Sequence, residues 1–227
     1  PQSGFHLQSL QSHPSSNPAM FIKRLIAPFV LVASTLAAPV VELEARQSCS
    51  ALQLVHAAGT TETGLGTVGT PLASALASAI PGTTSYPIIY DTSAEYVVTV
   101  SAGASIMASY ISAQAARCPN QRFVLSGYSK GAMVVHSTSL SSALKAKIRA
   151  VLVFGDPQRN VGGGWPINSP SVDLTPRDGS TSSQNIASFC NTGDVFCWPG
   201  GTSLAAHLAY PTDGSIGVAA NFVKTRP

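Results

Sequence analysis

The segment 125–131 reads Leu-Ser-Gly-Tyr-Ser-Lys-Gly and contains a Gly-x-Ser-x-Gly motif from Gly127 to Gly131. A predicted strand at 122–126 precedes the motif and a predicted helix begins near Gly131, so the motif occupies a strand-to-helix turn. There the serine lies in a strained conformation at the strand tip, and the flanking glycines let neighbouring backbone approach. The helix N-terminus directs unpaired N–H groups at the place where an oxyanion would form. The segment predicts that Ser129 is the nucleophile of a serine esterase.

Short apolar runs alternate with helical stretches on both sides of this motif. The runs are bounded by turn residues, as buried parallel strands are. This alternation predicts the α/β class, with one five-stranded parallel sheet, helices on both faces and ligands at the carboxyl ends of the strands. The Gly/Pro/Ser-rich segment 158–183 is expected to be a long loop within the same domain. The expected strands are 52–57, 86–90, 123–126, 150–154 and 186–189, and the expected helices are 71–79, 94–117, 132–147 and 214–224.

A serine nucleophile needs a base and an orienting acid, which in this architecture follow the serine in the order Asp or Glu, then His. Two histidines follow Ser129. His136 would lie two turns down the same helix and point away from the strand tip, so His207 is the predicted base. Every glutamate precedes the serine, which leaves five aspartates as candidate acids: Asp156, Asp173, Asp178, Asp194 and Asp213.

Asp194 is the preferred acid because of the segment around it. Residues 190–197 read Cys-Asn-Thr-Gly-Asp-Val-Phe-Cys and follow a predicted strand, so a small disulfide loop would enclose the carboxylate. A fixed loop would hold the tautomer and the orientation of the imidazole, which is the role of the acid. Asp156, after the predicted strand 150–154, is the alternative acid. Its other interpretation is a cap of the loop at Pro157.

The composition fits one domain and argues against several function classes. A chain of 227 residues, 44% hydrophobic and 10% charged, can bury a core that includes a sheet. The net charge of +3 is small and the Lys and Arg residues are scattered, so no nucleic-acid partner is expected. The predicted chemistry needs no organic cofactor and no metal.

Residues 20–37 have the pattern of a secretory signal peptide. Lys23 and Arg24 form the positive region, 25–36 the apolar region and 35–37 a small-residue cleavage site. The apolar run is too short to span a bilayer, so no stable membrane insertion is expected. An N-terminal core helix is the alternative, but nothing caps it and a proline breaks it. We interpret 1–19 as a non-native or untranslated leader, 38–46 as a possible propeptide and 47–227 as a catalytic domain, secreted as a monomer.

Four cysteines lie in the exported part, where an even count predicts two disulfides with three possible connectivities. Pairing by nearness joins Cys49 to Cys118 and Cys190 to Cys197. A metal site is the weaker alternative, because no Cys-x-x-Cys or His-x-x-x-His spacing occurs.

Other motifs have simpler explanations than a second function. The segment 64–69 matches Gly-x-Gly-x-x-Gly, but it follows the predicted strand by several residues, so turn formation explains it better than dinucleotide binding. His56 and His136 are interpreted as packed or hydrogen-bonded histidines. Trp165 and Trp198 lie in loops and are either walls of an acyl groove or loop-packing residues.

Three of these segments resemble those of the cutinase family, small disulfide-bonded α/β-hydrolases that include fungal acetylxylan esterases. The family has Gly-Tyr-Ser-Gln-Gly at the elbow, Cys-Asn-Thr-Gly-Asp with a second Cys around the acid, and His-Leu-Ala-Tyr at the base. The matching segments here are 127–131, with Lys130 in place of Gln, 190–197 and 207–210. The resemblance runs from Cys49 to the C-terminus. It implies a cutinase-like α/β-hydrolase fold, a triad of Ser129, Asp194 and His207, and the disulfide pairing by nearness.

The resemblance also implies an oxyanion hole. The family's Ala-Arg-Gly-Ser-Thr-Glu segment reads Ala-Ala-Gly-Thr-Thr-Glu at 57–62, so the N–H of Thr60 would be one donor and the backbone N–H of Lys130 the other. The sequence departs from the family at Ala58, where Arg is usual, and at Lys130. Because the Lys130 donor is a main-chain group, the hole should survive the change. Its ammonium would either favour the developing charge or misplace the loop around Thr60.

The expected reaction is the hydrolysis of carboxylic esters. The resemblance implies plant cutin, an aliphatic polyester, as the substrate, with acetylated xylan as the near alternative. The segment 198–206 is small and moderately apolar, which suits an open groove. A non-catalytic secreted surface protein is the remaining interpretation, and the complete set of Ser129, Asp194 and His207 argues against it.

Overall fold

The structure is a computed structural model and describes residues 49–180 and 183–227, which belong to one compact unit. The predicted leader (1–19), signal peptide (20–37) and propeptide (38–46) lie outside the described residues. The fold below therefore concerns the predicted catalytic domain.

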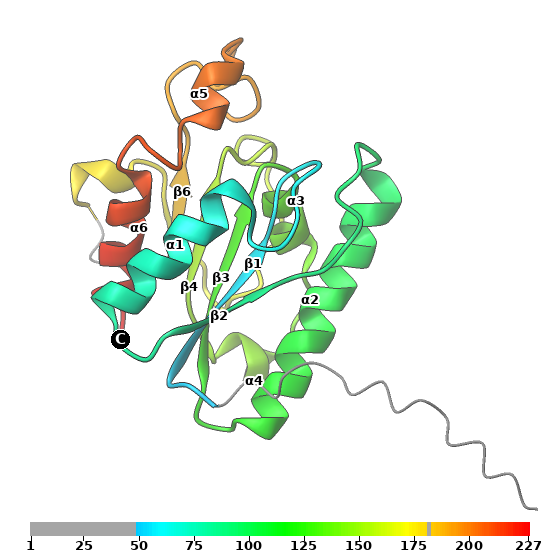
Figure 1. The fold of residues 1–227 in the computed structure, drawn as a ribbon, viewed down its shortest axis with the longest axis vertical. Helices are drawn as coiled ribbons and strands as arrows, with labels where there is room; N and C mark the ends of the chain where they lie inside the picture. Colours follow the sequence, from blue (N-terminus) through cyan, green and yellow to red (C-terminus); the bar gives the residue numbers. More distant parts are fainter. Residues whose placement is uncertain (1–48, 181–182) are drawn as a thin grey trace, which may run out of the picture. The chain divides into compact units, whose positions relative to one another are not determined.

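A parallel sheet of six strands forms the centre of this domain, in the order β2-β1-β3-β4-β6-β5 (Figure 1). The expectation of five strands is corrected by β5, which has two residues and pairs with β6. It lies within the segment expected to be a loop, and two residues are too few to show a strand pattern. The strands are β1 (Leu52–Ala57), β2 (Thr84–Pro87), β3 (Arg122–Tyr128), β4 (Ile148–Phe154), β5 (Val172–Asp173) and β6 (Ile186–Phe189).

Helices cover both faces of the sheet, as predicted (Figure 1). α1 and α6 pack in one hydrophobic cluster, and α2 and α3 pack in the other. The helices are α1 (Gly66–Ala79), α2 (Val97–Arg117), α3 (Lys130–Ser137), α4 (Ser142–Lys145), α5 (Leu204–Leu208) and α6 (Ser215–Lys224), with one 3₁₀ turn, η1 (Pro176–Asp178).

The central strands are largely apolar because each of their faces meets a layer of helices. In β4, Leu152 and Phe154 join the cluster of α1 and α6, whereas Val151 and Val153 join the cluster of α2 and α3. All four side chains are fully buried. Each such burial contributes about 1.5–3 kcal/mol, so the two clusters hold the sheet rigidly between the helices.

α2 has the length and the mean hydropathy, 1.2, of a helix that could cross a membrane. One of its faces carries Val100, Met107 and Ile111, which are buried in the core of the domain. This packing accounts for the apolar residues on that face.

The expected helix 132–147 is divided in two, because α3 ends at Ser137 and α4 follows. Beyond Ser137, the Thr138 hydroxyl donates to the Val134 carbonyl (2.7 Å) and the residue itself is extended. The Ser141 hydroxyl then accepts from the Leu144 N–H (3.4 Å) and begins α4. At this point hydroxyl side chains thus form hydrogen bonds with backbone groups that would bond one another in a continuous helix.

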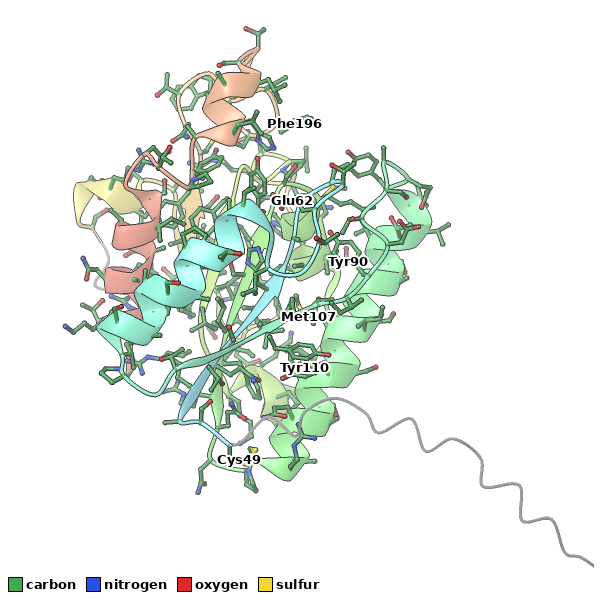
Figure 2. The ribbon with its side chains drawn as sticks, in the orientation of Figure 1. Cys49, Glu62, Tyr90, Met107, Tyr110 and Phe196 are labelled. Carbon is green, nitrogen blue, oxygen red and sulfur yellow. A yellow bond between two sulfur atoms is a disulfide. The ribbon has the colours of Figure 1, made fainter. Side chains whose placement is uncertain are left out.

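The carboxyl ends of β1, β3, β4 and β6 all lie at one edge of the sheet, since the strands are parallel. Figure 2 places Glu62 and Phe196 at this edge and Cys49 at the opposite one. The edge therefore gathers the loop after β1, the turn after β3 and the segment after β6.

Candidate functional site

Ser129 lies at the junction of β3 and α3 with a positive φ of 52°. This conformation is strained for a residue with a side chain. The turn is packed so closely that a Cβ on Gly131 would overlap the Ala57 carbonyl, and a Cβ on Gly127 would overlap the backbone of Gly131. The Ser129 N–H donates to the Phe154 carbonyl (2.9 Å), which fixes the turn to β4. The turn has the geometry of a nucleophile elbow.

His207, in α5, and Asp194, in the segment after β6, form a buried pair. The imidazole Nδ1 lies 3.0 and 2.9 Å from the two carboxylate oxygens. Both side chains are almost completely withdrawn from solvent. A carboxylate at Nδ1 selects the tautomer whose Nε2 can accept a proton, which is the form a general base needs.

Two further donors hold the Asp194 carboxylate. The Tyr210 hydroxyl donates to it at 2.5 Å and the Phe196 N–H at 2.8 Å. Burial disfavours the charged form, but the bonds from His207, Tyr210 and Phe196 outweigh it and hold the pKa of Asp194 below its usual range. Burial and the bond to the carboxylate raise the pKa of Tyr210. At neutral pH the acid is therefore ionised and its tyrosine partner is a donor.

Contacts with Tyr128, the residue before Ser129, bring His207 to the elbow. The Tyr128 hydroxyl donates to the His207 carbonyl (2.9 Å), and the two rings stack with centroids 5.1 Å apart. Gly155 leaves space for the imidazole, because a Cβ there would lie 2.6 Å from its Cε1. Within the described residues, both hydrogen bonds of the ring go to Asp194. Hydrogen bonds between nucleophile and base are often long before substrate binds, and tighten in the complex.

The alternative acid, Asp156, bonds a different histidine from the predicted base. Its Oδ2 lies 2.8 Å from Nε2 of the buried His136, and its Oδ1 accepts from the Gln158 N–H (2.8 Å). The His136 ring also contacts the Gly164 carbonyl (3.1 Å) and packs against Trp165, with centroids 3.9 Å apart. This pair fixes the loop after β4, so Asp156 has the capping role and Trp165 the packing role.

The predicted oxyanion loop follows β1 and is organised by Glu62. Its carboxylate accepts from the Gly59 N–H (2.7 Å) and, in the first turn of α1, from the Thr67 N–H (3.0 Å) and hydroxyl (2.5 Å). The Thr60 hydroxyl lies 3.1 Å from the Tyr96 hydroxyl. An internal carboxylate thus occupies the helix N-terminus where a dinucleotide-binding motif would hold phosphate. The glycines of that motif form a turn.

Lys130 is fully buried beside the elbow. Its Nζ donates to three backbone carbonyls, those of Asp91 (2.9 Å), Ser93 (2.5 Å) and Glu95 (2.8 Å). The ammonium therefore bonds the segment that precedes α2 rather than the Thr60 loop itself. The Lys130 backbone lies at the first position of α3, directly after Ser129.

The two disulfides pair Cys49 with Cys118 and Cys190 with Cys197, as pairing by nearness predicts. The second closes the short loop that contains Asp194. The described residues include no free cysteine and no group of three or more His, Cys, Asp or Glu able to hold a metal ion. All four cysteines are therefore structural.

His56 is packed rather than catalytic. It lies on β1, is fully buried, and its ring contacts the position of Gly69 in α1. Burial lowers its pKa to about 3, so the ring is neutral at physiological pH.

Comparison with known proteins places this geometry in a family. A family model described as Cutinase matches residues 48–226. The chain belongs to the cutinase family. It is 36% identical over 214 residues to a cutinase of Botryotinia fuckeliana, an alignment that covers 89% of this chain and 95% of the relative. Membership of this family makes the chain a carboxylic ester hydrolase.

Solved cutinase-family structures have the same fold. The structure of Trichoderma reesei cutinase in complex with a C11Y4 phosphonate inhibitor matches with a TM-score of 0.61 and 29% identity, over 77% of this chain and 75% of that one. The catalytic core domain of acetyl xylan esterase from Trichoderma reesei matches with a TM-score of 0.65 and 23% identity, over 79% and 100%. The cutinase-like α/β-hydrolase fold expected from the sequence is confirmed.

Three tyrosines of the site had no role in the sequence interpretation. Tyr210 belongs to the His-Leu-Ala-Tyr segment, so its motif could have pointed to a partner for the acid. Tyr128 occupies the variable position of the elbow and Tyr96 lies outside the motifs. Their contacts depend on packing between segments far apart in the chain.

Proposed function

We propose that this cutinase-family protein is a secreted serine esterase that hydrolyses cutin with Ser129 as nucleophile, His207 as base and Asp194 as orienting acid. The observation that carries the proposal is the juxtaposition at one sheet edge of a strained elbow serine and a buried His–Asp pair that contacts the elbow through Tyr128. Ser129 is half-buried, so the residue is not closed off from solvent at this edge.

In the proposed reaction, His207 Nε2 takes the hydroxyl proton of Ser129 while Oγ attacks the ester carbonyl. The N–H groups of Thr60 and Lys130 hold the tetrahedral oxyanion. Asp194 stabilises the imidazolium, which then protonates the leaving alcohol. Water, deprotonated by the same imidazole, attacks the acyl-enzyme and releases the acid and Ser129.

Two exposed apolar flanks support an aliphatic polyester as the substrate. One precedes and begins α2, where Val97 is 84% exposed, and includes Tyr96, whose hydroxyl contacts Thr60. The other surrounds α5, where Phe196 is 47% exposed and its ring packs edge-on against His207, with centroids 4.5 Å apart. Exposed apolar surface on both sides of a reacting group suits an insoluble, apolar ligand. The exposed apolar residues of the two flanks are Ile89, Tyr96, Val97 and Val98, and Val195, Phe196, Trp198, Leu204 and Leu208.

Hydrolysis of short p-nitrophenyl esters by the protein and by Ser129→Ala tests the triad. We expect the protein to be active and the Ala variant to lose at least about 10³-fold in kcat, because the nucleophile is removed. A protein without esterase activity, or an Ala variant with full activity, would exclude the proposed mechanism.

A series of esters from acetate to palmitate, measured beside cutin and acetylated xylan, tests the substrate. Activity that persists at medium and long acyl chains, with release of cutin monomers, is expected. A sharp fall beyond acetyl, with activity on acetylated xylan, would favour an acetylxylan esterase instead.

A further inference from the structure

We infer that the Lys130 side chain positions the oxyanion hole. The backbone of this residue supplies one proposed oxyanion donor, and its ammonium holds the segment 91–95, which is bonded to the loop that carries the other donor. The inference rests on the proposed esterase function and concerns the same site. Lys130 is a positioning residue, since its ammonium does not touch the reacting atoms.

The contacts of the ammonium account for all of its protons. A lysine ammonium has three N–H groups and no acceptor, and here three carbonyls, at residues 91, 93 and 95, surround Nζ at 2.5–2.9 Å. Nζ also lies 5.6 Å from the ring centroid of Tyr90 and 5.3 Å from that of Tyr96, distances at which a cation is attracted to an aromatic face. The side chain is fully buried, so water does not replace these partners.

The segment held by Lys130 is in turn bonded to the oxyanion loop. The Thr61 N–H donates to the Thr92 carbonyl (2.8 Å), and the Thr92 hydroxyl donates to the Glu62 carbonyl (2.8 Å). At the ends of this segment, the Tyr90 hydroxyl donates to the Ala58 carbonyl (2.6 Å) and the Tyr96 hydroxyl contacts the Thr60 hydroxyl (3.1 Å). Four contacts thus connect 90–96 to 58–62, on both sides of the predicted Thr60 donor.

Removal of the Lys130 ammonium would therefore change the position of Thr60 indirectly, through the segment 90–96. A neutral side chain at 130 removes the donor that these three carbonyls share, and the segment can then shift away from the elbow. An oxyanion donor must be held close to its productive position, because small displacements lower the rate strongly. The Lys130 backbone N–H is fixed by α3 and would remain in place.

The closing experiment compares Lys130→Met, which keeps the length of the side chain, with Lys147→Met. Lys147 also donates to a backbone carbonyl, that of Pro119, but lies at the opposite end of β3 and β4. Activity is expressed per reactive Ser129, counted by phosphonate titration. We expect Lys130→Met to lower kcat roughly tenfold with KM nearly unchanged, and Lys147→Met to keep the parent kcat.

A double-mutant cycle with Tyr96→Phe tests the route. If Lys130 acts through Tyr96, removal of the Tyr96 hydroxyl costs less kcat in the Lys130→Met background than in the parent protein. Independent effects that multiply, or an unchanged kcat in Lys130→Met, would overturn the inference.

The pH dependence of kcat tests the role of the positive charge on Lys130. Burial lowers the pKa of Lys130, opposed by the carboxylates of Asp91 and Glu95, so the third proton is lost at lower pH than in an exposed lysine. Tyr90 and Tyr96 face the same ammonium; burial, Glu62 and Tyr96 raise the pKa of Tyr90. We expect an alkaline fall in kcat that Tyr96→Phe retains and Lys130→Met lacks. The same alkaline profile in all three proteins would overturn the role of the charge.

Hydrogen exchange separates this inference from the proposed function, since it needs no activity. The Thr61 amide is protected by its bond to Thr92, and we expect its exchange to accelerate at least about tenfold in Lys130→Met but not in Lys147→Met. Faster exchange in a protein without esterase activity would refute the esterase and leave the loop contact in place. Unchanged exchange with normal esterase activity would refute the contact alone.

Discussion

The elbow (residues 127–131) and the acid–base segment (residues 190–210) supply the two halves of the candidate site by different means. The elbow is fixed by backbone: a β-strand enters it, a helix leaves it, and neighbouring main chain fills the space where glycine Cβ atoms would lie. The acid–base segment contains one five-residue helix, and side-chain hydrogen bonds and a disulfide hold it. Substitutions that add atoms should therefore disrupt the elbow. Substitutions that remove hydrogen bonds or the disulfide should disrupt the acid–base segment.

The largest expected effect is that of Asp194→Asn on catalysis. An amide cannot serve all three donors and would favour the wrong imidazole tautomer, so we expect kcat to fall about 10³–10⁴-fold while the protein stays folded. Ester hydrolysis and circular dichroism check both parts. Asp173→Asn is the matched control, a second buried aspartate whose pKa burial raises, and it should keep full activity. A near-normal kcat in the Asp194→Asn variant would remove Asp194 from the site.

The two disulfides should separate stability from activity. In the loop-entropy description, Cys49–Cys118 contributes about 4 kcal/mol and Cys190–Cys197 about 2.5 kcal/mol to the free energy of unfolding. We expect Cys49→Ser/Cys118→Ser to lower Tm more, yet to keep kcat in the folded fraction. Cys190→Ser/Cys197→Ser should lower Tm less and kcat more, because it loosens the loop around the acid. Thermal unfolding and active-site titration measure the two quantities, and the opposite ranking in kcat would contradict the comparison.

A single methyl group should disrupt the elbow. In Gly131→Ala the new Cβ meets the Ala57 carbonyl, and we expect a loss of about 3 kcal/mol in the free energy of unfolding together with loss of activity. Gly217→Ala is the control, because its Cβ meets nothing within 4 Å and lies in α6. That change should stabilise the protein by about 0.5–1 kcal/mol. Denaturant unfolding compares the two, and equal effects would mean that the elbow is not tightly packed.

Removal of one hydroxyl should have the smallest effect. Tyr210→Phe deletes a donor to the ionised carboxylate of Asp194, and we expect roughly a tenfold lower kcat. Because the pKa of Asp194 is depressed in the folded protein, its contribution to stability is present above the unfolded pKa, about 3.9, and is lost as pH falls through the folded value. The stability difference between parent and variant should therefore be largest at neutral pH and shrink in acid.

Tyr110→Phe is the control for Tyr210→Phe. Its hydroxyl donates to Gln53 (3.0 Å), away from the carboxyl ends of the strands (Figure 2). Loss of that bond should cost about 1 kcal/mol of stability and leave kcat unchanged. A lower kcat in Tyr110→Phe would show that such effects are not local to the acid.

The strands were among the features best predicted from the sequence. β1 and β6 have the expected bounds, because each is an apolar run between turn residues. Chain order selected His207, and the small disulfide loop selected Asp194 from five aspartates; the two side chains lie in hydrogen-bond contact. Their catalytic roles, with that of Ser129, stay predictions until activity is measured.

Features that depend on capping and on contacts between distant segments were not predicted. The expected helix 94–117 begins at Val97, because the Glu95 carboxylate accepts from the N–H groups of Val97, Val98 and Thr99. β2 begins at Thr84 rather than at residue 86. The partners of Lys130 were also missed, since the three carbonyls belong to a segment whose place in space no local pattern shows.

The position of Asp194 and His207 within one short segment, 190–210, has a consequence for protein engineering. The acid, the base, Tyr210 and the exposed apolar residues around α5 all lie between Cys190 and Tyr210. Outside the segment, the His207 ring stacks on Tyr128 and occupies the space that Gly155 leaves. We therefore expect that residues 190–210 can be exchanged between family members as one segment that carries the proposed acid and base together with the exposed apolar residues around α5.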